Sequence, residues 1–326
     1  MRSMQVPDPA ELGTPAGWRR AQQIRYHARH GEQRGVVAEV TVAMAQHLAY
    51  ENDYERAEEL LTEIHQGGQR YEALSRAGAA VQLAVIHDHT GRTESALRLL
   101  TEALPVLEQR QDKYAYALMR IGIVHAGTGD HDTALHWFAR ADEAAAGDAF
   151  LQAQVRDEMA MSESARGNFD RAARLHEAAL PVFRAAEAHP AVVMNLAAQA
   201  RLAARRNEPA DAHRKAVAAA EIAVTTGMLR HAAALFLDAG HWAEQVRDLR
   251  AAEQALRRSL EIGGAVDGFP AARAHYHLGI VYARMGTIDP AIYHVRELVR
   301  LQPEAAFTNW LEALLLNRQE LDGSSQ

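Results

Sequence analysis

Small apolar side chains recur along the chain at nearly constant intervals. Seven alanines stand in matching contexts, separated by 39, 38, 38, 40, 40 and 39 residues: Ala57, Ala96, Ala134, Ala172, Ala212, Ala252 and Ala291. Another small residue precedes each alanine by twelve positions: Ala45, Ala84, Gly122, Ala160, Ala200, Gly240 and Gly279. Small residues are needed where two helices cross too closely for a larger side chain. The pattern therefore predicts a series of helix pairs.

A turn is predicted five residues before each alanine. The residues at this position are Asn52, Gly91, Gly129, Gly167, Asn207, Arg247 and Gly286. Six of them are Gly or Asn, which tolerate the left-handed conformation that ends many helices, and Arg247 departs from this pattern. Asp53, Asp170 and Asp289 follow soon after three of the turns, where a carboxylate can accept free N–H groups of the next helix. Each unit is thus predicted to be two helices joined by a tight turn.

The last unit carries the clearest family pattern. Its segment YHLGIVYARMG, from Tyr276 to Gly286, is continued by Ala291 and Pro303. This segment resembles a tetratricopeptide repeat, whose pattern runs aromatic, Leu-Gly, Tyr, Gly, Ala, Pro. Repeats of 38–40 residues are longer than the common unit of about 34 and resemble those of kinesin light chains and bacterial tetratricopeptide regulators. The resemblance implies an all-α fold, a right-handed α-solenoid of about seven helix-turn-helix repeats with terminal capping helices.

Five segments follow from this assignment. We expect a flexible N-terminal segment (1–16), an Arg-rich N-terminal helix (17–35), seven repeats (36–303), a C-terminal capping helix (304–319) and a flexible tail (320–326). The capping helix is predicted from an apolar stripe with helical spacing: Phe307, Trp310, Leu311, Leu314 and Leu315. Such a helix covers the apolar face of the last repeat, which would otherwise be exposed.

Composition agrees with a helical protein. The 326 residues are 48% hydrophobic but only 6% aromatic, which favours packed helices over sheets. The net charge of −7 argues against nucleic acid as a partner. The sequence contains no uninterrupted apolar stretch of about 18 residues, so no membrane association is expected, and a cytoplasmic location fits. The absence of cysteine excludes thiol catalysis and Cys-ligated zinc.

The 17 histidines raise the question of metal or acid–base chemistry. His87 and His125 occupy the repeat position held by Tyr282 in the last unit, so we interpret them as packing residues. His87 and His89 lie two residues apart and cannot share a helix face. Phosphate-loop, nucleophile-elbow and dinucleotide motifs are absent. We therefore expect no catalytic residue, metal or cofactor; an enzyme using Asp157, Arg201 or His241 is the remaining catalytic alternative.

Repeat packing places the first helix of each unit on the concave wall of a solenoid. The expected partner-binding residues on this wall are Val81, Val85, Tyr116, Met119, Ile123, Asp157, Met161, Met194, Arg201, His241, Arg273 and Tyr276. The first five and Met161 would form an exposed apolar strip, which on a protein surface usually marks a contact. A protein or peptide partner would cover it. The Arg-rich N-terminal helix, tight coiling of the superhelix or a second copy of the chain could cover it instead.

These observations favour a non-enzymatic scaffold or adaptor that binds a protein or peptide. The alternative is a peptide- or partner-sensing regulator similar to bacterial tetratricopeptide regulators. Only about 35 residues precede the first repeat, so we expect no DNA-binding domain within this chain.

Overall fold

The computed structural model describes residues 6–266 and 268–323, and these residues form helices and short connections. A single 3-10 turn, Gly68–Arg70, joins two of the helices. The α-helices are α1 (Pro9–Leu12), α2 (Pro15–His30), α3 (Arg34–Tyr50), α4 (Tyr54–His65), α5 (Ala73–His89), α6 (Thr93–Leu107), α7 (Gln111–Gly127), α8 (His131–Ala144), α9 (Ala149–Ala165), α10 (Phe169–Ala185), α11 (His189–Arg205), α12 (Pro209–Thr225), α13 (Leu229–Gln245), α14 (Leu249–Gly263), α15 (Ala271–Arg284), α16 (Ile288–Leu301) and α17 (Ala305–Gly323).

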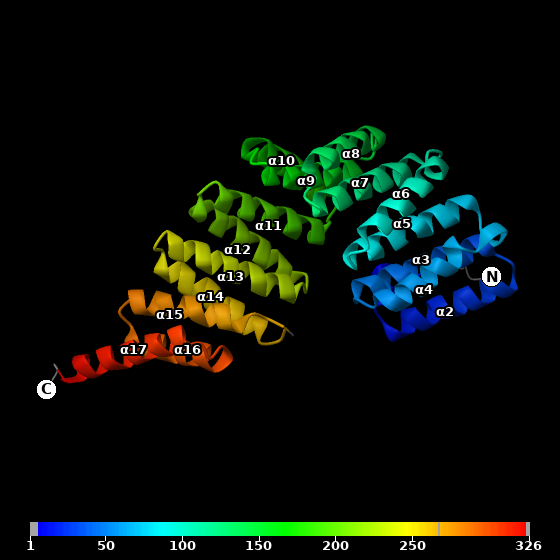
Figure 1. Ribbon diagram of the computed structural model, residues 1–326. Coiled ribbons are helices and arrows are strands. Elements are labelled where there is room, and N and C mark those ends of the chain that lie inside the picture. The colour runs from blue at the N-terminus through cyan, green and yellow to red at the C-terminus, as the bar shows by residue number, and fades with distance from the viewer. Residues whose placement is uncertain (1–5, 267, 324–326) are drawn as a thin grey trace. The chain divides into compact units, whose positions relative to one another are not determined.

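Sequential antiparallel helix pairs make up this all-α fold, as the sequence predicted. The chain divides into two compact units, Met1–Arg166 and Gly167–Gln326. The first unit contains α1–α9, coloured blue to green in Figure 1, and the second contains α10–α17, coloured green to red. We call the first helix of each pair the A helix and the second the B helix. The A helices are α3, α5, α7 and α9 in the first unit and α11, α13 and α15 in the second.

The periodic residues occupy the positions that the repeat pattern predicts. All seven recurring alanines have no exposed surface. All seven turn residues have a positive φ, including Arg247 at 59°. Arg247 therefore adopts the left-handed conformation although it carries a Cβ, because the turn between α13 and α14 requires the same geometry as the others. Asp53 caps α4 by accepting a hydrogen bond from the N–H of Arg56 at 3.3 Å.

The N-terminal end of the first unit is packed against the repeats. Leu12 is buried with residues of α2 and α3, so helical structure begins within the segment expected to be flexible. On α2, Trp18 lies with its ring centroid 5.8 Å from that of His47. Arg25 and Arg29 both form ion pairs with Glu63 on α4. The Arg-rich helix therefore packs on the first helix pair.

The second unit ends with α17. Trp310, Leu311, Leu314 and Leu315 of this helix pack against the core of the last repeat. The apolar stripe therefore has the contacts expected of a cap, and its helix continues to Gly323, beyond the expected end at residue 319. Deeper in the unit, Ser259 of α14 donates a hydrogen bond to the carbonyl of Ala233 at 2.7 Å. These contacts fix the helices that present the second unit's A-helix residues.

Candidate functional site

The A helices of the first unit form a groove. Its volume is about 710 Å³, and α3, α5 and α7 supply most of its lining. The apolar lining includes Val42, Ala43, Leu74, Val81, Leu107 and Tyr116, and the polar lining includes Glu39, Gln46, Ser75, Gln82, Asp112 and Lys113. We call this cavity the A-helix groove. A mostly apolar cavity with a few polar groups is the usual form of a binding site.

Only part of the expected apolar strip reaches this groove. Val81 and Tyr116 line it together, but Val81 is only 4% exposed and belongs to the core, so the expectation that it is an exposed residue is wrong. Met119 is likewise only 5% exposed; it does not line the groove and belongs to a core shared with Leu151 and Val155 of α9. The expectation that Met119 is an exposed contact residue is therefore wrong. Neighbouring A helices pack side by side, and α9 covers this face of α7.

The remaining residues of the expected strip differ in exposure. Val85 is half-buried, and Ile123 is half-buried against the α7–α9 core. Met161 on α9 is 49% exposed. Asp157 lies on the same helix and is half-buried. Burial, and to a smaller extent the charge of Asp157, raises the pKa of Glu158 to about 7. The strip is thus a set of separate apolar positions.

The expected residues of the second unit lie on α11, α13 and α15. Met194 and Arg201 are exposed on α11. On α15, Arg273 donates a hydrogen bond to Asp238 of α13 at 3.0 Å, so its charge is paired. Tyr276 is 37% exposed, and its ring centroid lies 6.0 Å from those of Phe307 and Trp310 on α17. Much of this wall is therefore polar, and aromatic rings gather at its C-terminal end.

One polar cluster joins α13 to α15. Its members are His241, Glu244 and His277, each offering one ligand atom within 4.8 Å of the others. The Nδ1–H of His277 donates to Glu244 Oε2 at 2.8 Å, and Arg284 donates to Glu244 Oε1 at 3.0 Å. The ring centroids of His241 and His277 are 4.7 Å apart. Burial lowers the pKa of His277, and the hydrogen bond that His277 donates to Glu244 opposes this effect.

Sequence analysis selected His241 from this cluster but missed the other two residues. His241 and Glu244 lie three positions apart on one helix and therefore share a face. His277 comes from the A helix of the next repeat. His277 is buried and lies outside the groove-facing positions of its helix, so only a search that included the buried face between neighbouring A helices would have found the group.

His87, one of the two histidines at the repeat position of Tyr282, behaves as a packing residue. Its Nε2 lies 3.2 Å from Glu58 Oε1, and the Tyr282 hydroxyl donates to Glu253 Oε1 at 2.8 Å. In each pair the glutamate precedes its partner by 29 residues, on the B helix of the preceding repeat. His87 and Tyr282 therefore make the same contact between neighbouring repeats.

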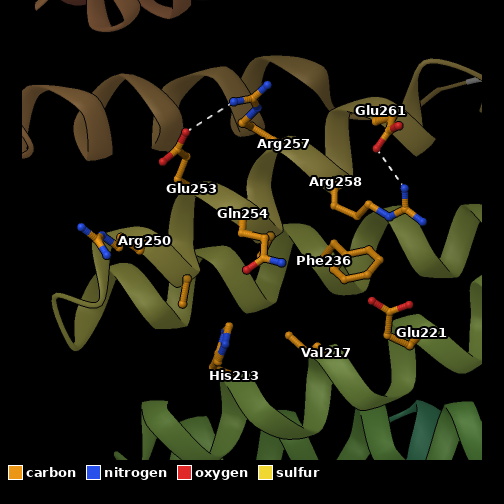
Figure 2. Close-up of a pocket in the computed structure, with 12 residues that line it drawn as sticks. His213, Val217, Glu221, Phe236, Arg250, Glu253, Gln254, Arg257, Arg258 and Glu261 are labelled. Carbon is orange, nitrogen blue, oxygen red and sulfur yellow. Dashed lines mark hydrogen bonds and ion pairs between the residues drawn. The ribbon is translucent and has the colours of Figure 1, made fainter. Parts of the chain in front are cut away.

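A second cavity lies among α12, α13 and α14 and has a volume of about 620 Å³. Figure 2 shows its lining, in which arginines and glutamates of α14 stand beside Phe236 and His213. Arg257 pairs with Glu253 at 3.5 Å and Arg258 with Glu261 at 3.0 Å. Because these charges pair within their own helix, the cavity offers no single-sign surface to a charged ligand.

Solved structures identify the fold. The TM-score is 0.73, at 15% identity, with a signal-transduction ATPase with numerous domains from Pyrococcus horikoshii that has a tetratricopeptide repeat sensor. The chain has a tetratricopeptide repeat fold. The match covers 95% of this chain but 47% of the ATPase, so the chain spans about half of that protein's length.

Two further tetratricopeptide repeat structures match over most of the chain. The apo form of the quorum sensor NprR from B. thuringiensis gives a TM-score of 0.60 at 12% identity, covering 94% of this chain and 95% of NprR. A Rap protein complexed with competence and sporulation factor gives 0.59 at 12% identity, covering 86% of this chain and 77% of Rap. The sequence matches no protein-family model and no curated protein. At these identities the likeness concerns the fold.

Among the helices of residues 6–266 and 268–323, none combines the length and apolar character needed to cross a bilayer.

Proposed function

We propose that this tetratricopeptide repeat protein is a non-catalytic scaffold that binds a segment of a protein or peptide in the A-helix groove. The observation that carries the proposal is the groove itself, a cavity of about 710 Å³ built from three successive A helices. A partner that spans several repeats would gain contacts from each helix without requiring any repeat to change shape.

The lining suggests the chemistry of the bound segment. Val42, Leu74 and Tyr116 offer apolar and aromatic surface, which suits apolar side chains. Gln46 and Gln82 each carry an amide that can both donate and accept, as a peptide backbone requires. We therefore expect a segment with apolar anchor residues and backbone contacts to these glutamines.

A peptide-sensing regulator is the second candidate. It is favoured by the match to the quorum sensor NprR, which covers nearly the whole length of both chains. A sensor differs from a passive scaffold in one measurable respect: its ligand must favour one of two conformations. Small-angle X-ray scattering with and without the bound segment distinguishes the two roles, because a change in radius of gyration is expected for a sensor alone.

Gly78 allows a direct test of the groove. This glycine lines the cavity within α5, and a Cβ added there would have no neighbouring atom within 4 Å. Gly78→Arg should therefore fill the groove with a long side chain without disturbing the helix. Thr101→Arg, at an exposed position of the B helix α6, adds the same side chain and charge away from the groove.

The experiment is capture of partners from a native-host lysate and from a displayed peptide library, using wild type and both variants. The proposal expects a bound segment that is lost in Gly78→Arg and retained in Thr101→Arg, with unchanged circular dichroism. Retention of every captured segment by Gly78→Arg would contradict binding in the groove. Recovery of the same chain alone would indicate self-association in place of a foreign partner.

A further inference from the structure

The cluster formed by His241, Glu244 and His277 contains the donor types of a transition-metal site. One ring nitrogen from each histidine and one carboxylate oxygen lie within 4.8 Å of one another. Two imidazoles and a carboxylate form a common ligand set for Zn²⁺ in proteins, usually with a fourth position left for water or another ligand. We propose that these three residues bind a divalent first-row transition ion, with Zn²⁺ as the representative ion, and thereby join the A helices of the last two repeats.

The separations are close to those of a bound ion. Bonds of about 2.0–2.2 Å place tetrahedral ligands about 3.3–3.6 Å apart. His277 Nδ1 and Glu244 Oε2 are 2.8 Å apart, so they need to separate only slightly. The ligand atoms lie within 4.8 Å of one another, so at the largest separation one side chain must approach by about 1–1.5 Å.

His241 provides an independent sign of an unsatisfied site. Its Nδ1 is buried and has no hydrogen-bond partner among the described residues. Its Nε2 lies 2.9 Å from the side-chain nitrogen of Gln245, which donates to it. This arrangement puts the ring proton on Nδ1, where the buried donor is left unpaired. Binding of an ion through Nδ1 would move the proton to Nε2 and remove this defect.

Neighbouring side chains can hold the ligands in place. After rotation of its amide, Gln245 would accept a hydrogen bond from Nε2–H of His241 through its Oε1, as the outer partners of metal-bound histidines commonly do. Arg284 holds Glu244 Oε1 at 3.0 Å and leaves Oε2 on the side of His277. The Glu244 carboxylate would thus bind the ion through one oxygen. Arg273 also lies near the cluster, but its charge is paired with Asp238.

Zinc titration of untagged, chelator-treated protein tests this assignment. Isothermal titration calorimetry should show one tight Zn²⁺ site per chain, and zinc should raise the melting temperature, whereas Mg²⁺ should do neither because it prefers oxygen ligands. His241→Gln should weaken zinc binding by about 100-fold or more. Gln245→Ala, outside the ligand set, should weaken it by about 10-fold. Circular dichroism checks that each variant is folded.

His231→Gln is the matched control, since His231 is an exposed histidine on the same helix α13. It should retain the affinity and the zinc-dependent rise in melting temperature. Absence of tight zinc binding by the wild type would overturn the proposal. It would also be overturned if His241→Gln and His231→Gln bound zinc equally well, because binding would then arise from scattered surface histidines. Neither result depends on whether the A-helix groove binds a peptide.

Discussion

Two glycines of the first unit should respond differently to the same substitution. Gly122 of α7 lies at the crossing with α8, where a Cβ would be 2.5 Å from Cε1 and 2.6 Å from Cδ1 of Phe138. Phe138 is fully buried, so it cannot move freely. Gly78 of α5 is also inside a helix, but a Cβ there would meet no atom within 4 Å. We therefore compare Gly122→Ala with Gly78→Ala.

Both substitutions replace glycine by the best helix former, which stabilises a helix by about 0.8–1.0 kcal/mol. Gly78→Ala should show this gain in the free energy of unfolding. Gly122→Ala should combine the same gain with an overpacking cost of about 1–3 kcal/mol, since ordinary contacts begin near 3.4 Å. The difference between the two variants removes the common helix term and isolates the cost of crowding at the crossing, about 1–3 kcal/mol.

Urea unfolding followed by circular dichroism measures this difference, and both positions belong to the first unit. Gly122→Leu should be less stable than Gly122→Ala because it adds more atoms to the same space. If Gly122→Ala and Gly78→Ala were equally stabilising, the close α7–α8 crossing, and with it the assignment of the small residues, would be refuted.

Three further predictions concern stability. Met119→Ala should lower the free energy of unfolding by about 2–5 kcal/mol because Met119 is in the core. Met161→Ala, at a half-exposed position, should change it by less than about 0.5 kcal/mol. Equal effects of the two substitutions in urea unfolding would contradict the difference in burial. Arg247→Gly should raise the melting temperature and increase the free energy of unfolding by about 0.5–1 kcal/mol, since the φ of 59° suits glycine. A lower melting temperature would show that contacts of the Arg247 side chain stabilise the fold by more than its left-handed backbone destabilises it. Burial, together with the positive charges of His275 and Arg257, lowers the pKa of His294 to about 4. In the unfolded chain this histidine takes up its proton near pH 6.5, whereas in the folded chain it stays neutral until about pH 4. The free energy of unfolding should therefore fall by about 3 kcal/mol in total as the pH drops from about 6.5 to below 4. His294→Gln should flatten this dependence in unfolding titrations, and an unchanged slope would exclude His294 as its source.

The geometry behind the His294 prediction is a contact between two imidazoles. His294 Nδ1 lies 2.9 Å from His275 Nδ1, and its ring stacks on Tyr282 with an interplanar angle of 9°. One proton between the two nitrogens forms a hydrogen bond, but a second would place two N–H groups face to face. Arg257 adds to this repulsion, and Glu297 is the charge that opposes it.

The repeat register could be predicted from the sequence because its signals are steric and local. A glycine or alanine at a helix crossing, and a turn residue at a fixed offset, have direct geometric meaning in each repeat. Arg247 marks the limit of that reasoning. Its identity departs from the pattern, yet its φ of 59° matches the other turns, because the packing of α13 against α14 determines the backbone there.

The A-helix groove and the cluster of His241, Glu244 and His277 depend on contacts between neighbouring repeats, which the pattern within one helix does not contain. Met119 occupies a groove-facing position by helical period, but α9 covers it. His241, Glu244 and His277 converge only because α13 and α15 lie side by side. Predicting such sites requires the side-chain directions of two neighbouring repeats together with their spacing.

The central claim, that the A-helix groove binds a partner segment, is tested most directly by the affinity of one captured segment for two variants of the same residue. Gly78→Ala adds a methyl group that meets no atom within 4 Å, whereas Gly78→Arg extends a long charged side chain into the groove. Calorimetric titration of the segment should give an affinity close to wild type for Gly78→Ala and at least about 10-fold weaker for Gly78→Arg, a loss of about 1.4 kcal/mol or more. Equal affinities for the two folded variants would contradict the claim and place the partner on another surface.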